Sequence, residues 1–249
     1  MSFLKNLNYN TEIEKVVNVQ FGILSDEEVK RRSVAEIFTY ETYDGDVPKM
    51  GGLFDPRMGV LDNGLICPTD GLNNRLCPGY FGHITLAKPV FHYHFINYIL
   101  KTLKNVCLKC SCCYIDPDQF KNQLENTTGL KRFNLITKLA SKSKTCGDHN
   151  ENGCGAIRPT SYKKDSNLCN IIVEYKVKNK DKQTIKLSVS DIKNIFKRIS
   201  DKDCEAMGFN VTWCRPEWLI CSVLPVAPPT VRPSVKQDNN TRMEDDLTH

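Results

Sequence analysis

The alternation of hydrophobic and polar residues predicts the secondary structure of the second half of the chain. In the stretch "NIIVEYKVKNKDKQTIKLSV", two alternating runs flank a polar "KNKDKQ", a pattern typical of an antiparallel β-hairpin at residues 170–189. Hydrophobic residues then repeat at helical spacing, which predicts a helix: Ile192, Ile195, Phe196 and Ile199. Ser190 is its expected N-cap, and Ser200 is expected to cap a further short helix that ends at Gly208.

Helical periodicity also predicts a helix over residues 89–106, "PVFHYHFINYILKTLKNV". Its apolar face is expected to pack in the core: Val90, Phe91, Phe95, Tyr98, Ile99, Leu103 and Val106. His92 and His94 lie beside this face, and we expect them to pack or to lie at the surface. Another helix is expected over residues 116–129. In residues 214–226, "CRPEWLICSVLPV", the first proline predicts a helix start and the apolar run predicts a strand.

The two ends of the chain show less regular patterns. The β-branched residues of "TEIEKVVNVQFGIL", residues 11–24, favour a strand, and Ser25 with Glu28 has the spacing of a capping box at the start of a short helix. Residues 44–88 are rich in Gly, Pro, Asp and Asn without periodicity, so we expect an ordered loop that something other than a hydrophobic face must hold. Residues 227–249 are Pro-rich and then polar, which predicts an extended tail that orders only against a partner.

Composition and charge place the chain among ordinary globular proteins with a real core. Its 249 residues carry a net charge of +5, which permits contact with nucleic acid without demanding it. No apolar run approaches the length of a membrane span, and the N-terminus lacks the apolar region of a signal peptide, so we expect an intracellular protein without a membrane partner. Thiols stay reduced there, so the 12 cysteines are expected to be metal ligands or small buried side chains.

Cysteine spacing points to a zinc site. Cys107 and Cys110 form a C-x2-C pair, and "CGDHNENGC" supplies Cys146 and Cys154. Two such pairs can surround one zinc ion tetrahedrally. Cys110 and Cys113 also form a C-x2-C pair, so spacing alone leaves the choice of ligands open, and it leaves open that these cysteines are only buried side chains.

The stretch "CPTDGLNNRLCPGYFGHITLAKPVFH", residues 67–92, is more ambiguous. It holds the thiols of Cys67 and Cys77, while Asp70 could supply an oxygen and His83 an imidazole. Structural zinc favours sulfur and imidazole, so chemistry alone leaves open a mixed metal site, the remnant of one, or a tight turn. Hydrolase, P-loop, metalloprotease and zinc-deaminase motifs are absent, and no catalytic residue is assigned.

Colinear motifs from about residue 14 to the last residue resemble one family, the largest subunit of multisubunit DNA-dependent RNA polymerases of the eukaryotic, archaeal and large-DNA-virus type. The stretches that carry the resemblance are "SVAEI", "GGLFDPRMGVLD", "CPGYFGHITLAKPVFH", "CLKCS", "GCGAIRPT", "IFKRIS", "MGFN", "RPEWLICSVLPVAPPTVRPSV" and "EDDLTH". The resemblance implies a mixed α+β, clamp-type fold with zinc-stapled loops, a β-hairpin and several helices. It assigns residues 1–226 to this clamp-like region, with a zinc-binding part at about 60–160, and residues 227–249 to a tail.

The resemblance also implies which cysteines bind metal. The family's second zinc site falls on Cys107, Cys110, Cys146 and Cys154, which selects the first C-x2-C pair. Its first zinc site, C-x2-C-x6-C-x2-H, falls on Cys67, Asp70, Cys77 and Tyr80, with His83 close by. Half of these ligands are replaced, so the resemblance implies one zinc site and a second, degenerate one.

The implied function is the clamp part of a DNA-directed RNA polymerase, closing over DNA and the RNA–DNA hybrid. No N-A-D-F-D-G-D occurs, so catalytic magnesium is expected only elsewhere in the enzyme, whose second-largest subunit and remaining largest subunit are the expected partners. The alternative is a stand-alone inactive homologue that acts as a zinc-binding interaction module. Location would be the nucleus for a cellular protein, and host cytoplasm or virion for a viral one. Basic residues expected to touch nucleic acid are Lys163, Lys164, Lys193, Lys197 and Arg198.

Overall fold

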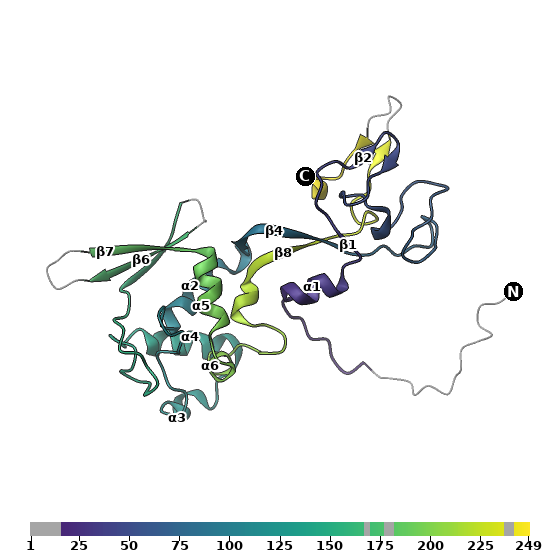
Figure 1. Cartoon of the computed structure of the whole chain (residues 1–249). Helices are drawn as coiled ribbons and strands as arrows, with labels where there is room; N and C mark the ends of the chain where they lie inside the picture. Colours follow the sequence, from purple (N-terminus) through teal and green to yellow (C-terminus); the bar gives the residue numbers. More distant parts are fainter. Residues whose placement is uncertain (1–15, 167–169, 177–181, 237–241) are drawn as a thin grey trace.

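A long two-stranded ribbon joins two lobes of unequal size. The computed structural model describes residues 16–166, 170–176, 182–236 and 242–249, and it has the expected mixed α+β architecture (Figure 1). The described residues between 92 and 219 form the large lobe, on the left of Figure 1. Residues 37–81 and the described part of 227–249 form the small lobe on the right, and the short helix α1 (Asp26–Arg32) lies below the ribbon.

The ribbon consists of β4 (Gly82–Phe91) and β8 (Ile220–Val226), which run antiparallel. Gly82 pairs with Val226 at one end and Phe91 with Ile220 at the other, and a register irregularity lies between Thr85 and Val90. The two-residue strand β1 (Ala35–Glu36) adds to β4 in parallel near the small lobe. The chain therefore leaves for the large lobe at Phe91 and returns from it at Ile220.

The large lobe holds the main hydrophobic core. Its helices are η3 (Tyr93–Phe95), α2 (Ile96–Asn105), α3 (Lys121–Leu124), α4 (Gly129–Ala140), α5 (Val189–Lys197), α6 (Asp201–Ala206) and η4 (Pro216–Leu219). Ile99 and Leu103 of α2, Ile136 of α4 and Phe196 of α5 are buried together in this core. Helical spacing of apolar residues places these side chains on the inner faces of their helices.

A three-stranded antiparallel sheet projects from the large lobe. β6 (Asn170–Lys176) pairs with β7 (Lys182–Ser188), which confirms the predicted hairpin, and its turn lies outside the described residues. β5 (Ser161–Lys164), which we did not predict, adds on the other side of β6. Ile171 and Val173 alternate with more exposed neighbours, so one face of β6 joins the core.

Local capping signals were right in part. Ser200 caps α6, with its hydroxyl accepting from the Asp203 N–H, and Gly208 follows the helix with a φ of 90°, as predicted. The predicted cap of α5 was wrong: Ser188, not Ser190, is the N-cap, in a reciprocal capping box with Asp191. Ser188 and Ser190 lie two residues apart and offer the same capping chemistry, and the end of β7 at Ser188 determines which one is used.

Other elements differ from the sequence prediction. Residues 16–24 are extended without strand pairing, and residues 89–95 lie in β4 and η3, so the helix begins only at Ile96. The helix expected over residues 116–129 is reduced to α3. We missed α4, although its buried Phe133, Ile136 and Ala140 have helical spacing.

The small lobe is an irregular loop region with few apolar contacts. It contains β2 (Tyr43–Asp44) paired with β3 (Val47–Pro48), the single turn η2 (Pro56–Met58), and a small core of Ala35, Ile37, Met58 and Val226. Asp55, with no exposed surface, accepts from the N–H of Gly51 and from the Arg57 side chain. Hydrogen bonds to a buried carboxylate thus replace a hydrophobic face in holding this loop.

The described C-terminal residues contact residues 43–62 of the small lobe, and the expectation that they order only against a partner stays a prediction. β9 (Val235–Lys236) pairs with β10 (Arg242–Met243), and η5 (Asp246–Thr248) follows. Arg232, 2% exposed, lies over the Phe54 ring and donates to the backbone carbonyl of Leu53. Arg242 lies over the Tyr43 ring and pairs with Asp62 at 2.7 Å. Arginine therefore supplies the anchors that the apolar pattern lacked.

A partly buried ion pair connects α1, α5 and β8. The Lys193 ammonium donates to Asp26 at 2.6 Å and also to the Ser222 hydroxyl, and the Lys193 side chain is 10% exposed. The second Asp26 oxygen accepts from the Ser222 N–H at 3.4 Å. An ammonium so enclosed depends on its anionic partner, because burial removes most of its own hydration.

Asp26→Ala should therefore lower the free energy of unfolding by about 2 to 4 kcal/mol, because the Lys193 charge stays buried without its partner. Denaturation in urea measures this loss. Glu41→Ala is the control, since it removes an exposed ion pair with Lys49 and should cost less than about 1 kcal/mol. Equal losses in the two variants would contradict a structural role for Lys193.

Candidate metal centre

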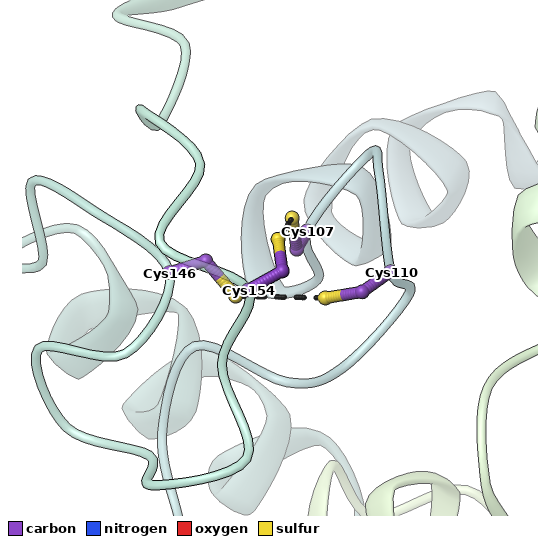
Figure 2. Close-up of side chains that lie close together, drawn as sticks. All are labelled: Cys107, Cys110, Cys146 and Cys154. Carbon is purple, nitrogen blue, oxygen red and sulfur yellow. Dashed lines mark hydrogen bonds between the residues drawn. The ribbon is translucent and has the colours of Figure 1, made fainter.

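Four cysteines from two separate loops meet at the surface of the large lobe. Cys107 and Cys110 lie in the turn after α2, and Cys146 and Cys154 lie at the two ends of a loop after α4 (Figure 2). Their sulfur atoms all lie within 4.8 Å of one another. Cys107 and Cys146 are buried, whereas Cys154 is exposed.

The sulfur separations fit a tetrahedral zinc ion. Cys107 Sγ lies 3.6 Å from Cys154 Sγ, and Cys110 Sγ lies 3.6 Å from Cys146 Sγ. Sulfurs bonded to zinc at about 2.3 Å in a tetrahedron stand about 3.8 Å apart. Because four thiols and no other ionisable group make up the cluster, the donor set also fits zinc.

The first pair is held by a tight turn. The Cys107 N–H donates to the Cys112 carbonyl and the Ser111 N–H donates to the Cys107 carbonyl, each at 2.9 Å. Ser111 adopts a φ of 64°, a left-handed conformation that costs a residue with a Cβ about 1 kcal/mol or more. This turn points both sulfurs to one side, which is what the C-x2-C spacing requires.

The second pair is held by the backbone of its own loop. The Cys146 N–H donates to the Ala156 carbonyl, and the Gly155 N–H donates back to Cys146 at 2.7 Å. A Cβ on Gly153 would lie 2.4 Å from the Gly147 nitrogen, so only glycine allows the loop to close. Asn150 connects the two loops, since its amide donates to the Cys113 carbonyl at 2.8 Å.

Burial and hydrogen bonding act in opposite directions on these thiols. Burial raises the pKa of Cys107 and of Cys146. Burial also acts to raise the pKa of Cys110, but the Cys112 N–H and the three neighbouring thiols donate to its sulfur and lower that pKa to about 7. Metal binding to Cys107 and Cys146 must therefore displace protons, as it does in structural zinc sites.

Cys113, the alternative zinc ligand, does not belong to the four-cysteine cluster. Cys113 belongs to neither group of potential metal ligands among the described residues, and complete burial raises its pKa to about 12. The cysteines that the structure describes are all free thiols. The choice of Cys107 with Cys110, which rested on resemblance, is therefore the one that the geometry favours.

The other cysteine loop brings together Cys67, Asp70 and Cys77, whose ligand atoms lie within 4.8 Å of one another. The Tyr80 hydroxyl donates to Asp70 at 3.1 Å. His83 does not join this group: its ring nitrogens lie 2.8 Å from the Ser33 hydroxyl and 3.9 Å from Glu36. The expectation that His83 could complete the loop was wrong, because β4 directs its side chain toward β1.

The basic residues expected to contact nucleic acid lie in different surroundings. Lys193 is buried in its ion pair, which gives it a structural role in place of the expected phosphate contact. Lys163 is exposed and pairs with Glu174 at 2.7 Å, and Lys164 is its exposed neighbour in β5. Lys197 and Arg198 are exposed at the end of α5, where cations are favourable beside the helix carbonyls.

The fold and the cysteine cluster define an α+β protein in which two loops bring four thiols together. The chain belongs to the family "RNA polymerase Rpb1, domain 1", whose model matches residues 13–249. This family forms the N-terminal region of the largest RNA polymerase subunit, as the resemblance implied.

Two curated relatives support this membership. The chain is 40% identical to "DNA-directed RNA polymerase subunit Rpo1N" of Methanocaldococcus jannaschii, covering 96% of the chain and 18% of that protein. It is 38% identical to "DNA-directed RNA polymerase II subunit RPB1" of Euplotoides octocarinatus, covering 96% of the chain and 52% of that protein. The chain thus spans only part of the length of these relatives.

Cys146→Ser should remove tightly bound zinc and expose the loops around residues 107–113 and 146–154, because zinc–thiolate bonding supplies on the order of 10 kcal/mol of folding free energy. Metal analysis and hydrogen exchange measure the two effects. Cys112→Ser is the control and should keep the metal. Loss of zinc from Cys112→Ser with retention in Cys146→Ser would reverse the ligand assignment.

Proposed function

We propose that this chain is the clamp part of the largest subunit of a DNA-directed RNA polymerase. The observation that carries the proposal is the match of nearly the whole chain to that subunit's first domain. Cys107, Cys110, Cys146 and Cys154 would hold zinc, which ties two loops together and supplies folding free energy to the large lobe. The role that we propose for this zinc site is structural, and we assign no catalytic residue in this chain.

In this role the two lobes and their ribbon form a wall beside DNA and the RNA–DNA hybrid. Lys164, Lys197 and Arg198 are exposed and would meet phosphates, whereas Lys163 already pairs with Glu174. Lys163 and Lys164 are adjacent in β5 and alternate between its two faces, so they do not form one phosphate-binding row. Contacts are therefore expected to be few and electrostatic.

Catalysis would depend on groups beyond this sequence. Phosphoryl transfer needs bound metal ions to neutralise developing charge, and the chain contains no D-F-D-G-D. The second-largest subunit and the rest of the largest subunit are the proposed partners, in the nucleus or cytoplasm where polymerases of this family work. Among the described residues, no helix is long and apolar enough to cross a membrane.

The isolated chain should show no nucleotidyl transfer and should co-purify with the other polymerase subunits when all are expressed together. Affinity capture followed by an RNA-extension assay tests both points. RNA extension by the chain alone would contradict the first. Failure to associate with any polymerase subunit would favour the alternative, a stand-alone inactive interaction module.

Within the assembled enzyme, Lys197→Glu with Arg198→Glu should weaken DNA binding. Each lost phosphate contact should reduce the slope of log affinity against log salt by about 1. Fluorescence anisotropy at several salt concentrations gives this slope. Lys138→Glu with Lys142→Glu is the matched control, since these exposed lysines lie at the end of α4 in a similar setting. Equal effects would indicate general charge repulsion without a local contact.

A further inference from the structure

The loop of residues 57–80 brings two thiols, a carboxylate and a phenol together, and hydrogen bonds already engage the carboxylate. Both oxygens of Asp70 already accept: Oδ1 from the Leu72 N–H at 2.8 Å, and Oδ2 from the Tyr80 hydroxyl at 3.1 Å. A zinc ion at this position would have to break the contact with Tyr80 or share its oxygen. Asp70 is thus the hydrogen-bond acceptor on which the loop converges.

The two thiols lie beside this carboxylate. Cys67, with no exposed surface, donates to the Arg57 carbonyl at 3.8 Å. Cys77 is also buried, and its sulfur lies within 4.8 Å of an Asp70 carboxylate oxygen. Loss of hydration acts to raise the pKa of Asp70, but the hydrogen bonds that it accepts, led by the one from the Leu72 N–H, hold this pKa below its usual value.

The loop also closes without a metal ion through its backbone and its small core. The Cys67 N–H donates to the Leu72 carbonyl at 2.9 Å, and the Cys77 N–H donates to the Asn73 carbonyl at 2.9 Å. Cys67 and Cys77 pack against Val60 in a buried cluster. In the Cys107 loop, by contrast, four sulfurs face one another and no carboxylate accepts from them.

We infer that the Asp70 carboxylate replaces a metal ion as the centre of this loop, accepting hydrogen bonds from the Leu72 N–H and the Tyr80 hydroxyl beside the thiols of Cys67 and Cys77, so that the loop binds no zinc. An anion at the centre of the loop inverts the charge pattern of a cation surrounded by thiolates. The inference concerns this loop alone and does not depend on whether the Cys107 cluster holds zinc.

Zinc content of the full-length chain, measured by mass spectrometry, tests the inference. The paired change Cys67→Ser and Cys77→Ser should leave the content unchanged. The paired change Asp70→Cys and Tyr80→His should raise it by about one zinc per chain, because it supplies the sulfur and imidazole that structural zinc favours. Cys146→Ser reports separately on the other cluster, so failure of that site remains distinguishable.

Hydrogen exchange provides a second test. Chelation with EDTA should leave the amide protection of residues 57–80 unchanged. Asp70→Ala should reduce that protection severalfold without changing the zinc content. The inference is overturned if the variant with Cys67→Ser and Cys77→Ser binds one zinc fewer than the wild-type protein. It is also overturned if EDTA lowers the amide protection of residues 57–80.

Discussion

The antiparallel pairing of β4 with β8 is the constraint on which the rest of the structure depends. It joins residues 82–91 to residues 220–226, so the whole large lobe is a loop that leaves and re-enters at one end of the ribbon (Figure 1). At the other end, the small-lobe loop and the C-terminal residues emerge side by side. Closing so long a loop costs conformational entropy, which the core of the large lobe and the Asp26–Lys193 ion pair help to offset.

The two lobes are stabilised by different chemistry. In the large lobe, helices and the β5–β6–β7 sheet bury a continuous apolar core. In the small lobe the apolar clusters are small, and buried or half-buried polar groups hold the chain: Asp55 accepts from Gly51, Arg232 donates to Leu53, and Arg242 pairs with Asp62. Charged hydrogen bonds of this kind impose geometry without a periodic sequence signal. This explains why the segment could be expected to be ordered although it shows neither helical nor strand periodicity.

Sequence alone could predict the features with local causes. The hairpin of β6 and β7, the cap at Ser200 and the left-handed Gly208 depend on neighbouring residues, and the structure confirms them. The predictions failed where distant segments decide. Residues 89–91 were expected to be helical, but they form strand because β4 pairs with β8. His83 was a candidate metal ligand, but its position in β4 directs its side chain toward Ser33. Lys193 has the sequence signature of a surface lysine, yet Asp26 and Ser222 enclose it. The four-cysteine cluster was predicted only with the help of family resemblance, because spacing alone could not distinguish Cys107 from Cys113.

The two cysteine loops face the same physical problem and differ in which charge lies at the centre. Each must fix an irregular backbone whose apolar residues cannot form a large core. Around Cys107, four thiols with no carboxylate acceptor form an arrangement in which a cation is the group that can satisfy them together. Around Cys67, the Asp70 carboxylate already accepts from the Leu72 N–H and the Tyr80 hydroxyl. Asp70 and Tyr80 stand where zinc would favour sulfur and imidazole, and they satisfy each other through a hydrogen bond instead. Cys67 and Cys77 have a packing role that needs no metal ion, because both thiols are buried against Val60.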